Sequence, residues 1–194
     1  MKLYATPTSP YARIPRIAVH AKSLEDKVEF VWTKTRIPND PMFEFNPSGR
    51  IPFLALDDGT GLEDVPLIID YLDTLGGPKI NKAESWAERG IQATAEAMLD
   101  GLCNWLREDM RPHDAQYQTL IEHESTRAKR LLDYFEGLCE EAPVSGPLNL
   151  TQLYLLSSLM IERRVEAFAW RKDYPKLVDW YDEMIAQAAV EKGL

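Results

Sequence analysis

The sequence predicts an α/β domain followed by an all-helical domain, and three observations carry this prediction. Short strand-like segments alternate with helical ones only within the first 77 residues. A turn with two prolines and a glycine, residues 46–52, leads directly into one of those strands. Beyond this region the sequence is helical almost throughout, and 194 residues suffice for two small cores. We expect domains at 1–77 and 85–194, joined by a polar linker at 78–84.

Composition excludes several classes of function. Hydrophobic content of 45% with 27% charged residues is ordinary for a globular protein. The net charge of −9 and the lack of a basic run oppose binding to nucleic acid. No apolar run approaches the ~18–20 residues needed to span a membrane. The N-terminal residues show no signal-peptide pattern, so the cytoplasm is the default location.

The residues that commonly bind metals show no suitable spacing. Cys103 and Cys139 are too few and too far apart for a disulfide framework or a zinc site. His20, His113 and His123 lack metal-ligand spacing as well. No metal cofactor is expected.

The first segment predicts a strand, a helix and a second strand. Residues 2–5 and 28–32 are the two strand candidates. Between them, Ser9 followed by Pro10 is typical of a helix N-cap with proline at the first helical position. The apolar positions of that helix recur at helical spacing, at Ile14, Ile17, Ala18 and Ala21. Two strands joined by a helix form a βαβ unit whose strands are parallel.

The turn at residues 46–52 is a candidate for a cis peptide bond. Proline reduces the trans preference of the bond before it to ~0.5–1 kcal/mol, and Pro52 lies in a tight turn. A cis Ile51–Pro52 bond would expose the backbone N–H and C=O of Ile51 to a ligand. The alternative is a plain loop entering a strand, because proline is tolerated as a first strand residue.

After this turn the sequence predicts a hairpin and a helix. Residues 53–56 and 60–63 flank an Asp-Gly pair, which is a strong hairpin signal. Asp64 is placed to cap the next helix, whose expected buried residues are Leu67, Ile68, Tyr71, Leu72 and Leu75. The resulting order, β-α-β and then β-β-α, is the thioredoxin-like arrangement, with Pro52 at the position of its cis proline.

The second domain is predicted to be a helical bundle. Residues 86–110 form a long helix, and Asp114 can cap the next one, which runs to about residue 141. Asn149 and Gln152 have the spacing of a capping box. The helix beyond them is apolar on almost every side, so we expect it at the centre of the bundle. A last helix starts near Pro175.

Several segments together resemble a bacterial cytosolic glutathione transferase. They are Thr8-Ser9-Pro10-Tyr11-Ala12, residues 46–52, Asp57-Asp58-Gly59 and residues 68–72, and the likeness covers nearly the whole chain. The resemblance implies a thioredoxin-like α/β domain, an all-α C-terminal bundle and a homodimer. It also implies glutathione as co-substrate, a small hydrophobic electrophile and a role in detoxification.

Ser9 is the catalytic residue that this resemblance implies. The thiolate is the reactive form of a thiol, and a helix N-terminus with a hydroxyl donor stabilises an anion. From the residues alone, Ser9 could equally be a simple cap, and Thr8 and Tyr11 are rival hydroxyls. Ser9 and Ala12 supply no cysteine, so disulfide exchange through a protein thiol is disfavoured.

The resemblance also implies the groups that bind glutathione. Ile51, beside Pro52, would pair its backbone with the cysteinyl residue as a short β-strand addition. Arg50 could reach the glycine carboxylate or could simply be solvated. Asp64 could take the γ-glutamyl ammonium or only cap its helix. Val65 replaces the usual serine, which removes a hydroxyl but leaves a backbone N–H at a helix N-terminus.

Ligand sites favour domain interfaces, so we expect the second substrate between Ser9 and the long helix from residue 86. The candidate pocket residues are Tyr11, Met98, Trp105 and Arg107, although an aromatic or Met at helical spacing is more often core. The alternative function is a non-catalytic member that keeps the fold as a binding or regulatory module. Val65 favours this alternative, whereas Ser9 and Pro52 oppose it.

Overall fold

A computed structural model describes residues 1–35, 37 and 40–194. The chain divides into two compact units, the first formed by Met1–Asn81 with Gln187–Leu194 and the second by Lys82–Ala186. This division differs from the predicted domains, because the last residues belong to the first unit. There α7 (Ala188–Gly193) packs on α1 (Pro10–Ala21). Gly193 lies so close to Ile17 that a Cβ atom would be 2.6 Å from the Ile17 Cγ1 atom.

The described part of the first unit contains a four-stranded sheet in the spatial order β2-β1-β3-β4. The central strand β1 runs parallel to β2 and antiparallel to β3, and β3 and β4 form an antiparallel hairpin. The mixed sheet is the one that the sequence predicts. The strands are β1 (Lys2–Ala5), β2 (Glu29–Trp32), β3 (Phe53–Ala55) and β4 (Gly61–Glu63).

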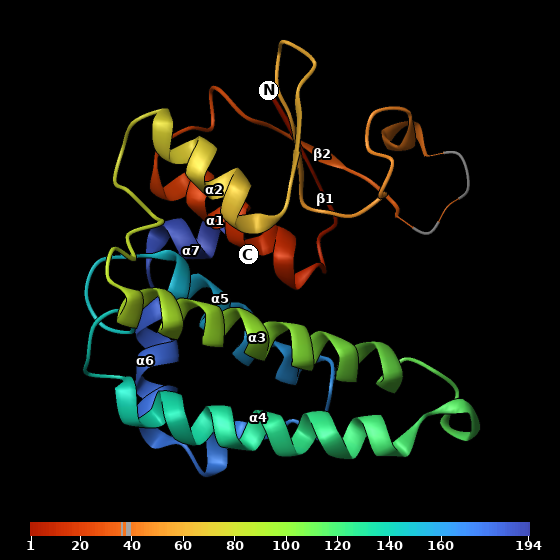
Figure 1. Cartoon of the computed structure of the whole chain (residues 1–194), viewed down its shortest axis with the longest axis vertical. Helices are drawn as coiled ribbons and strands as arrows, with labels where there is room; N and C mark the ends of the chain where they lie inside the picture. The colour runs from red at the N-terminus through yellow and green to blue at the C-terminus, as the bar shows by residue number, and fades with distance from the viewer. Residues whose placement is uncertain (36, 38–39) are drawn as a thin grey trace. The chain divides into compact units, whose positions relative to one another are not determined.

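Helices α1 and α2 (Val65–Thr74) pack together (Figure 1). Each of them buries apolar side chains. A short 3-10 helix, η1 (Pro41–Glu44), precedes the proline turn. One expectation for α2 is wrong: Leu67 is 48% exposed, while its neighbour Ile69 is fully buried. The buried face of α2 is therefore rotated from the predicted one, toward the side that carries Ile68, Ile69 and Leu72.

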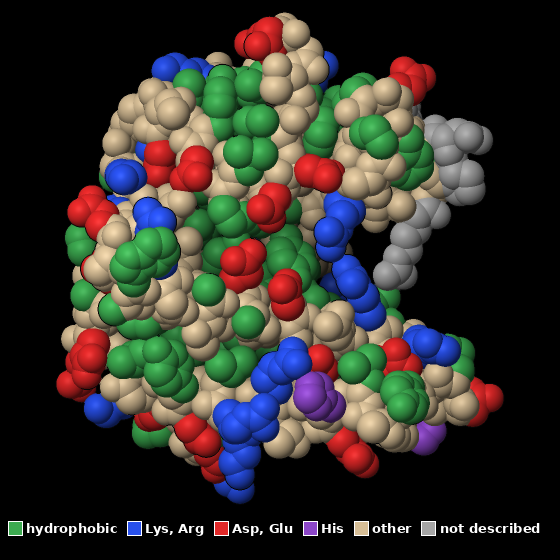
Figure 2. Space-filling model, viewed as in Figure 1, with side chains coloured by type: hydrophobic (Ala, Val, Ile, Leu, Met, Phe, Trp, Pro, Cys, Tyr) green, Lys and Arg blue, Asp and Glu red, His purple; other side chains and the backbone are tan. Residues whose placement is uncertain are grey.

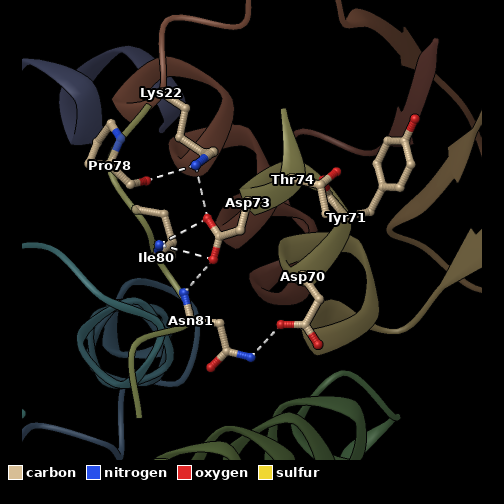
Figure 3. A network of polar contacts seen from close by, with 8 residues as sticks. All are labelled: Lys22, Asp70, Tyr71, Asp73, Thr74, Pro78, Ile80 and Asn81. Carbon is tan, nitrogen blue, oxygen red and sulfur yellow. Dashed lines mark hydrogen bonds and ion pairs between the residues drawn. The ribbon is translucent and has the colours of Figure 1, made fainter. Parts of the chain in front are cut away.

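A buried ion pair ties α1 to the residues after α2 (Figure 3). The Lys22 Nζ atom lies 2.9 Å from Asp73 Oδ1 and donates to the Pro78 carbonyl oxygen at 2.7 Å. Their side chains are 0% and 8% exposed. Asp73 also accepts the backbone N–H groups of Ile80 and Asn81. Both charges are thus paired and hydrogen-bonded, as buried charges must be.

The second unit is a bundle in which α3 packs against both α4 and α5, and Figure 1 shows α3 and α4 side by side. Every residue of α5 is buried, as expected for the central helix. Asp114 does not cap α4: it lies in a 3-10 turn, and α4 begins after Tyr117 without a side-chain cap. The elements are α3 (Trp86–Asp109), η2 (His113–Ala115), α4 (Gln118–Leu138), α5 (Leu150–Leu159), η3 (Met160–Arg163), η4 (Trp170–Lys172) and α6 (Pro175–Ile185).

The predicted capping box at the start of α5 is confirmed, and it is buried. Asn149 Oδ1 accepts the Gln152 N–H at 3.1 Å, and Gln152 Oε1 accepts the Asn149 N–H at 3.0 Å. The two amide groups also donate to carbonyl oxygens of the preceding loop, those of Pro143, Val144, Gly146 and Pro147. The box therefore fixes both the helix start and the loop that leads into it.

Replacing Asn149 by alanine is expected to lower the free energy of unfolding by about 1–3 kcal/mol, since it removes a buried cap and the donor to the part-buried Pro143 and Pro147 carbonyls. Urea denaturation measures the change. The matched control is Ser85→Ala in the capping box of α3, where Ser85 and Glu88 pair in the same way but at the surface. For Ser85→Ala we expect the free energy of unfolding to fall by about 0.5–1 kcal/mol. A smaller loss for Asn149→Ala than for Ser85→Ala would contradict this account.

The surface shown in Figure 2 carries acidic and basic side chains interspersed with one another. No helix among the described residues combines the length and the apolar character needed to cross a bilayer.

Candidate functional site

Ser9 stands at the N-terminus of α1 as its N-cap. Its backbone is extended, with φ −72° and ψ 121°, and its Oγ atom accepts the Ala12 N–H at 3.2 Å. Pro10 occupies the first helical position, and the first turn of α1 contains no acidic residue. Because the hydroxyl oxygen accepts this bond, the hydroxyl proton can still be donated to an anion. The capping role and the ligand role that the sequence left open are therefore compatible.

The rival hydroxyls occupy different positions. Thr8 precedes the cap and is exposed, whereas Tyr11 follows it in the first turn and is half-buried. Of these three hydroxyls, that of Ser9 receives the Ala12 N–H. The α1 backbone therefore orients the Ser9 hydroxyl.

The proline turn lies next to the start of β3. The Ile51–Pro52 bond is cis, so the predicted isomer is confirmed. Gly49 has φ 62°, a conformation that glycine adopts without steric cost, and its N–H donates to the Asn46 carbonyl at 3.0 Å. Within the described residues, the backbone N–H and C=O of Ile51 form no hydrogen bond. They are the groups that an extended peptide requires for pairing.

Asp64 has an unusual backbone conformation just before α2. Its φ of 83° lies in the region that favours glycine, which for an aspartate is an outlier of the kind found at ligand sites. Its Oδ1 atom accepts the Val65 N–H at 3.0 Å. The Val65 N–H therefore already has an acceptor, and its part in binding glutathione stays a prediction. The Val65 side chain is buried, whereas Asp64 is exposed.

Comparison with known proteins shows which family and fold the chain resembles. The family model described as Glutathione S-transferase, N-terminal domain, matches residues 8–75. A glutathione S-transferase from Methylobacillus flagellatus, solved with glutathione bound, superposes with a TM-score of 0.87 at 27% identity, covering 99% of this chain and 98% of that one. Residues 8–75 belong to the N-terminal domain family of the glutathione S-transferases. The predicted thioredoxin-like α/β domain with an all-α bundle is confirmed as the glutathione transferase fold.

Two curated relatives match over most of their length. Glutathione S-transferase 2 of Saccharomyces cerevisiae is 27% identical, over 100% of this chain and 89% of its own. The uncharacterized GST-like protein YibF of Escherichia coli is 25% identical, over 96% of this chain and 95% of its own. The glutathione transferase likeness therefore extends through both units.

The residues predicted to line a second-substrate pocket differ in their surroundings. Met98 and Trp105 are buried in the second unit, where Trp105 packs edge-on against Phe168 with ring centroids 6.0 Å apart. This is the core role that the sequence left open for them. Arg107 is exposed and Tyr11 is half-buried, and the part of these four residues in substrate binding stays a prediction.

The two cysteines of the chain are buried in the second unit, at Cys103 in α3 and Cys139 after α4. Burial raises the pKa of the Cys139 thiol to about 11, with the nearby Glu136 carboxylate as a smaller cause. A thiol with such a pKa is a poor nucleophile at neutral pH. No group of three or more metal-ligating side chains occurs within the described residues.

Sequence reasoning missed three side chains that hold the proline turn. Asn46 is 0% exposed, and its amide Nδ2 donates to the Arg50 carbonyl at 2.8 Å. Ser48 Oγ accepts the Arg50 N–H at 3.0 Å and is hydrogen-bonded to Glu63 Oε2. An Asn two residues before a Ser in a Pro-Gly turn is a local signal for such bonds. The contact with Glu63 spans two elements and has no local signal.

Proposed function

We propose that this protein is a glutathione transferase in which the Ser9 hydroxyl stabilises the glutathione thiolate for attack on a small hydrophobic electrophile. The observation that carries the proposal is the Ser9 hydroxyl at the tip of α1, whose oxygen is occupied by Ala12 N–H and whose proton can be donated. The aligned N–H groups of the helix terminus favour the same negative charge.

In the proposed reaction, the thiol proton leaves to solvent and the thiolate sulfur forms a bond to an electrophilic carbon. A leaving group then departs with its electron pair, or, in an addition, the electron pair of the double bond takes up a proton. The Ser9 O–H donates to the sulfur before attack, which lowers the thiol pKa and increases the thiolate fraction. No covalent protein intermediate is required.

The Ile51 backbone would orient the tripeptide through the cysteinyl N–H and C=O. Asp64, whose Oδ2 atom is outside the contact with Val65, would bind the γ-glutamyl ammonium. Arg50 has an exposed side chain and would bind the glycine carboxylate. Location in the cytoplasm and assembly as a homodimer stay predictions from the family resemblance.

A non-catalytic member that keeps the glutathione transferase fold as a binding or regulatory module is the second candidate. The observation that favours it is Val65, which has no hydroxyl and whose N–H already donates to Asp64. Loss of one hydrogen bond to a charged group removes about 1.5–3 kcal/mol of binding energy. This weakening makes the affinity for glutathione the first quantity to measure.

Glutathione is expected to raise the unfolding temperature. At 100 times Kd a ligand adds about 2.7 kcal/mol, which for a chain of this size corresponds to roughly 5–10 °C. Thermal unfolding in millimolar glutathione measures the shift, and cysteinylglycine, which lacks the γ-glutamyl group, is the control. No shift with glutathione would contradict the transferase and favour the module. A shift without conjugation of any electrophile in a panel would indicate a ligand carrier.

A further inference from the structure

The two peptide groups that flank the Arg50 Cα atom are both held by side chains of the same turn. The Arg50 N–H donates to Ser48 Oγ at 3.0 Å, and the Arg50 carbonyl oxygen accepts from Asn46 Nδ2 at 2.8 Å. The Arg50 side chain takes no part in either bond. The turn thus fixes the backbone of residue 50 and leaves its side chain exposed.

The bond to the Arg50 carbonyl also sets the direction of the next N–H. A trans peptide is planar, and its C=O and N–H point in opposite directions. The Arg50–Ile51 bond is not among the cis bonds of the chain, so the Ile51 N–H points away from Asn46. Because Asn46 is 0% exposed, the carbonyl is directed toward the interior and the Ile51 N–H away from it.

Asn46 is itself held in place by its neighbours. Its backbone N–H donates to the Met42 carbonyl at 2.9 Å, and its own carbonyl accepts the Gly49 N–H. Its Oδ1 atom lies 3.0 Å from Ser48 Oγ. The Asn46 side chain donates through its amide nitrogen, follows a hydrogen-bonded backbone and has no exposed surface, so it has little freedom to turn and can act as a fixed donor.

The Ser48 hydroxyl connects this turn to the end of β4. Ser48 has one hydroxyl proton, and the Glu63 carboxylate is the stronger of its two acceptors because it is charged. Glu63 is the last residue of β4 and is followed directly by Asp64. The segments at 50–52 and 64–65 are therefore linked by side chains outside the proposed ligand contacts.

We infer that Asn46 is a positioning residue for the thiol substrate, which presents the Ile51 N–H to the cysteinyl carbonyl, and that the Ser48–Glu63 bond holds the Asp64 segment in register with it. This inference rests on the proposed function. Asn46 and Ser48 do not touch the reacting sulfur. Their substitution therefore changes the binding of glutathione more than the chemical step.

The test compares Asn46→Ala and Ser48→Ala with the wild-type protein. The readouts are Kd for glutathione by calorimetry, and KM and kcat with an electrophile that the wild type accepts. For Asn46→Ala we expect Kd and KM to rise about 10-fold, with kcat at saturation within about 2-fold. For Ser48→Ala we expect a rise of about 3-fold, which Ser48→Thr restores. The matched control is Asn81→Ala, where another asparagine of the first unit loses its bond to Asp70. Its KM should not change.

A second readout needs no glutathione. In NMR relaxation of the free protein, the Ile51 amide is expected to be as ordered as those of β3 in the wild type and to lose order in Asn46→Ala. If Asn46→Ala does not fold, Ser48→Ala with its Ser48→Thr rescue serves both readouts.

An unchanged Ile51 amide in the variant, or an unchanged Kd where the wild type binds glutathione, overturns the inference. A wild type that does not bind glutathione, with a loosened Ile51 amide in the variant, overturns the proposed function and leaves the positioning role of Asn46 supported.

Discussion

Replacing Asp73 by alanine is expected to lower the free energy of unfolding by about 3–5 kcal/mol, since it leaves a buried ammonium without its counter-charge. The Lys22 side chain is 0% exposed and would keep only the Pro78 carbonyl as a partner. The same substitution removes the acceptor for the Ile80 and Asn81 N–H groups. Urea denaturation followed by circular dichroism measures the loss.

The matched control for this prediction is the exposed pair of Lys176 and Glu140, 3.4 Å apart with side chains 54% and 81% exposed. Glu140→Ala is expected to change stability by less than about 1 kcal/mol. The double variant Lys22→Met with Asp73→Ala should lower the free energy of unfolding by less than the sum of the two single losses. The reason is that no unpaired charge then remains at this buried position. Equal losses for Asp73→Ala and Glu140→Ala would show that the Lys22–Asp73 pair contributes no more than a surface pair.

Replacing Ser9 by alanine is expected to reduce turnover at pH 7 by about 10- to 100-fold, since a hydrogen bond to a charged group contributes about 1.5–3 kcal/mol. The physical reason is the thiol pKa, which the hydroxyl donor lowers by favouring the thiolate. Without the donor, this pKa rises toward the ordinary value of about 8.5. The deficit should therefore shrink as the pH is raised through that value, and a pH–rate profile measures it.

Ser9→Asp separates this role from capping. Aspartate caps a helix about as well as serine, so stability should be retained. Its carboxylate cannot donate a hydrogen bond and repels a thiolate, so turnover should fall at least as far as in Ser9→Ala. Tyr11→Phe and Thr8→Ala test the rival hydroxyls and should leave the pH profile in place. If Ser9→Ala keeps the wild-type pH–rate profile, the thiol is activated by the Thr8 or the Tyr11 hydroxyl and not by Ser9.

Features that depend on neighbouring residues were predictable. Ser9 before Pro10 indicated the start of α1, and Asn149 with Gln152 indicated the start of α5. Both depend on bonds between residues three apart, and such bonds form within one turn of chain. The proline at position 52 likewise indicated its own peptide isomer.

Features that depend on rotation about a helix axis or on remote contacts were not predictable. The apolar pattern of α2 indicated that Leu67 faces the core, whereas Leu67 is 48% exposed and Ile69 is fully buried. The Asp64 backbone has a φ of 83°, and its carboxylate accepts the Val65 N–H. No local pattern indicates that conformation for an aspartate.

Short-range chemistry in the amino-acid sequence thus determined the order of strands and helices, the caps of α1 and α5, and the turn that carries Pro52. The tertiary structure decided which side chains hold that turn, through the buried Asn46 amide and the contact between Ser48 and Glu63. It also decided that residues 187–194 pack on α1 rather than within the helical bundle. The physical reason is the separation along the chain between the residues in contact. A cap or a turn is completed within a few residues, whereas these contacts form only after burial of the core has brought distant segments together.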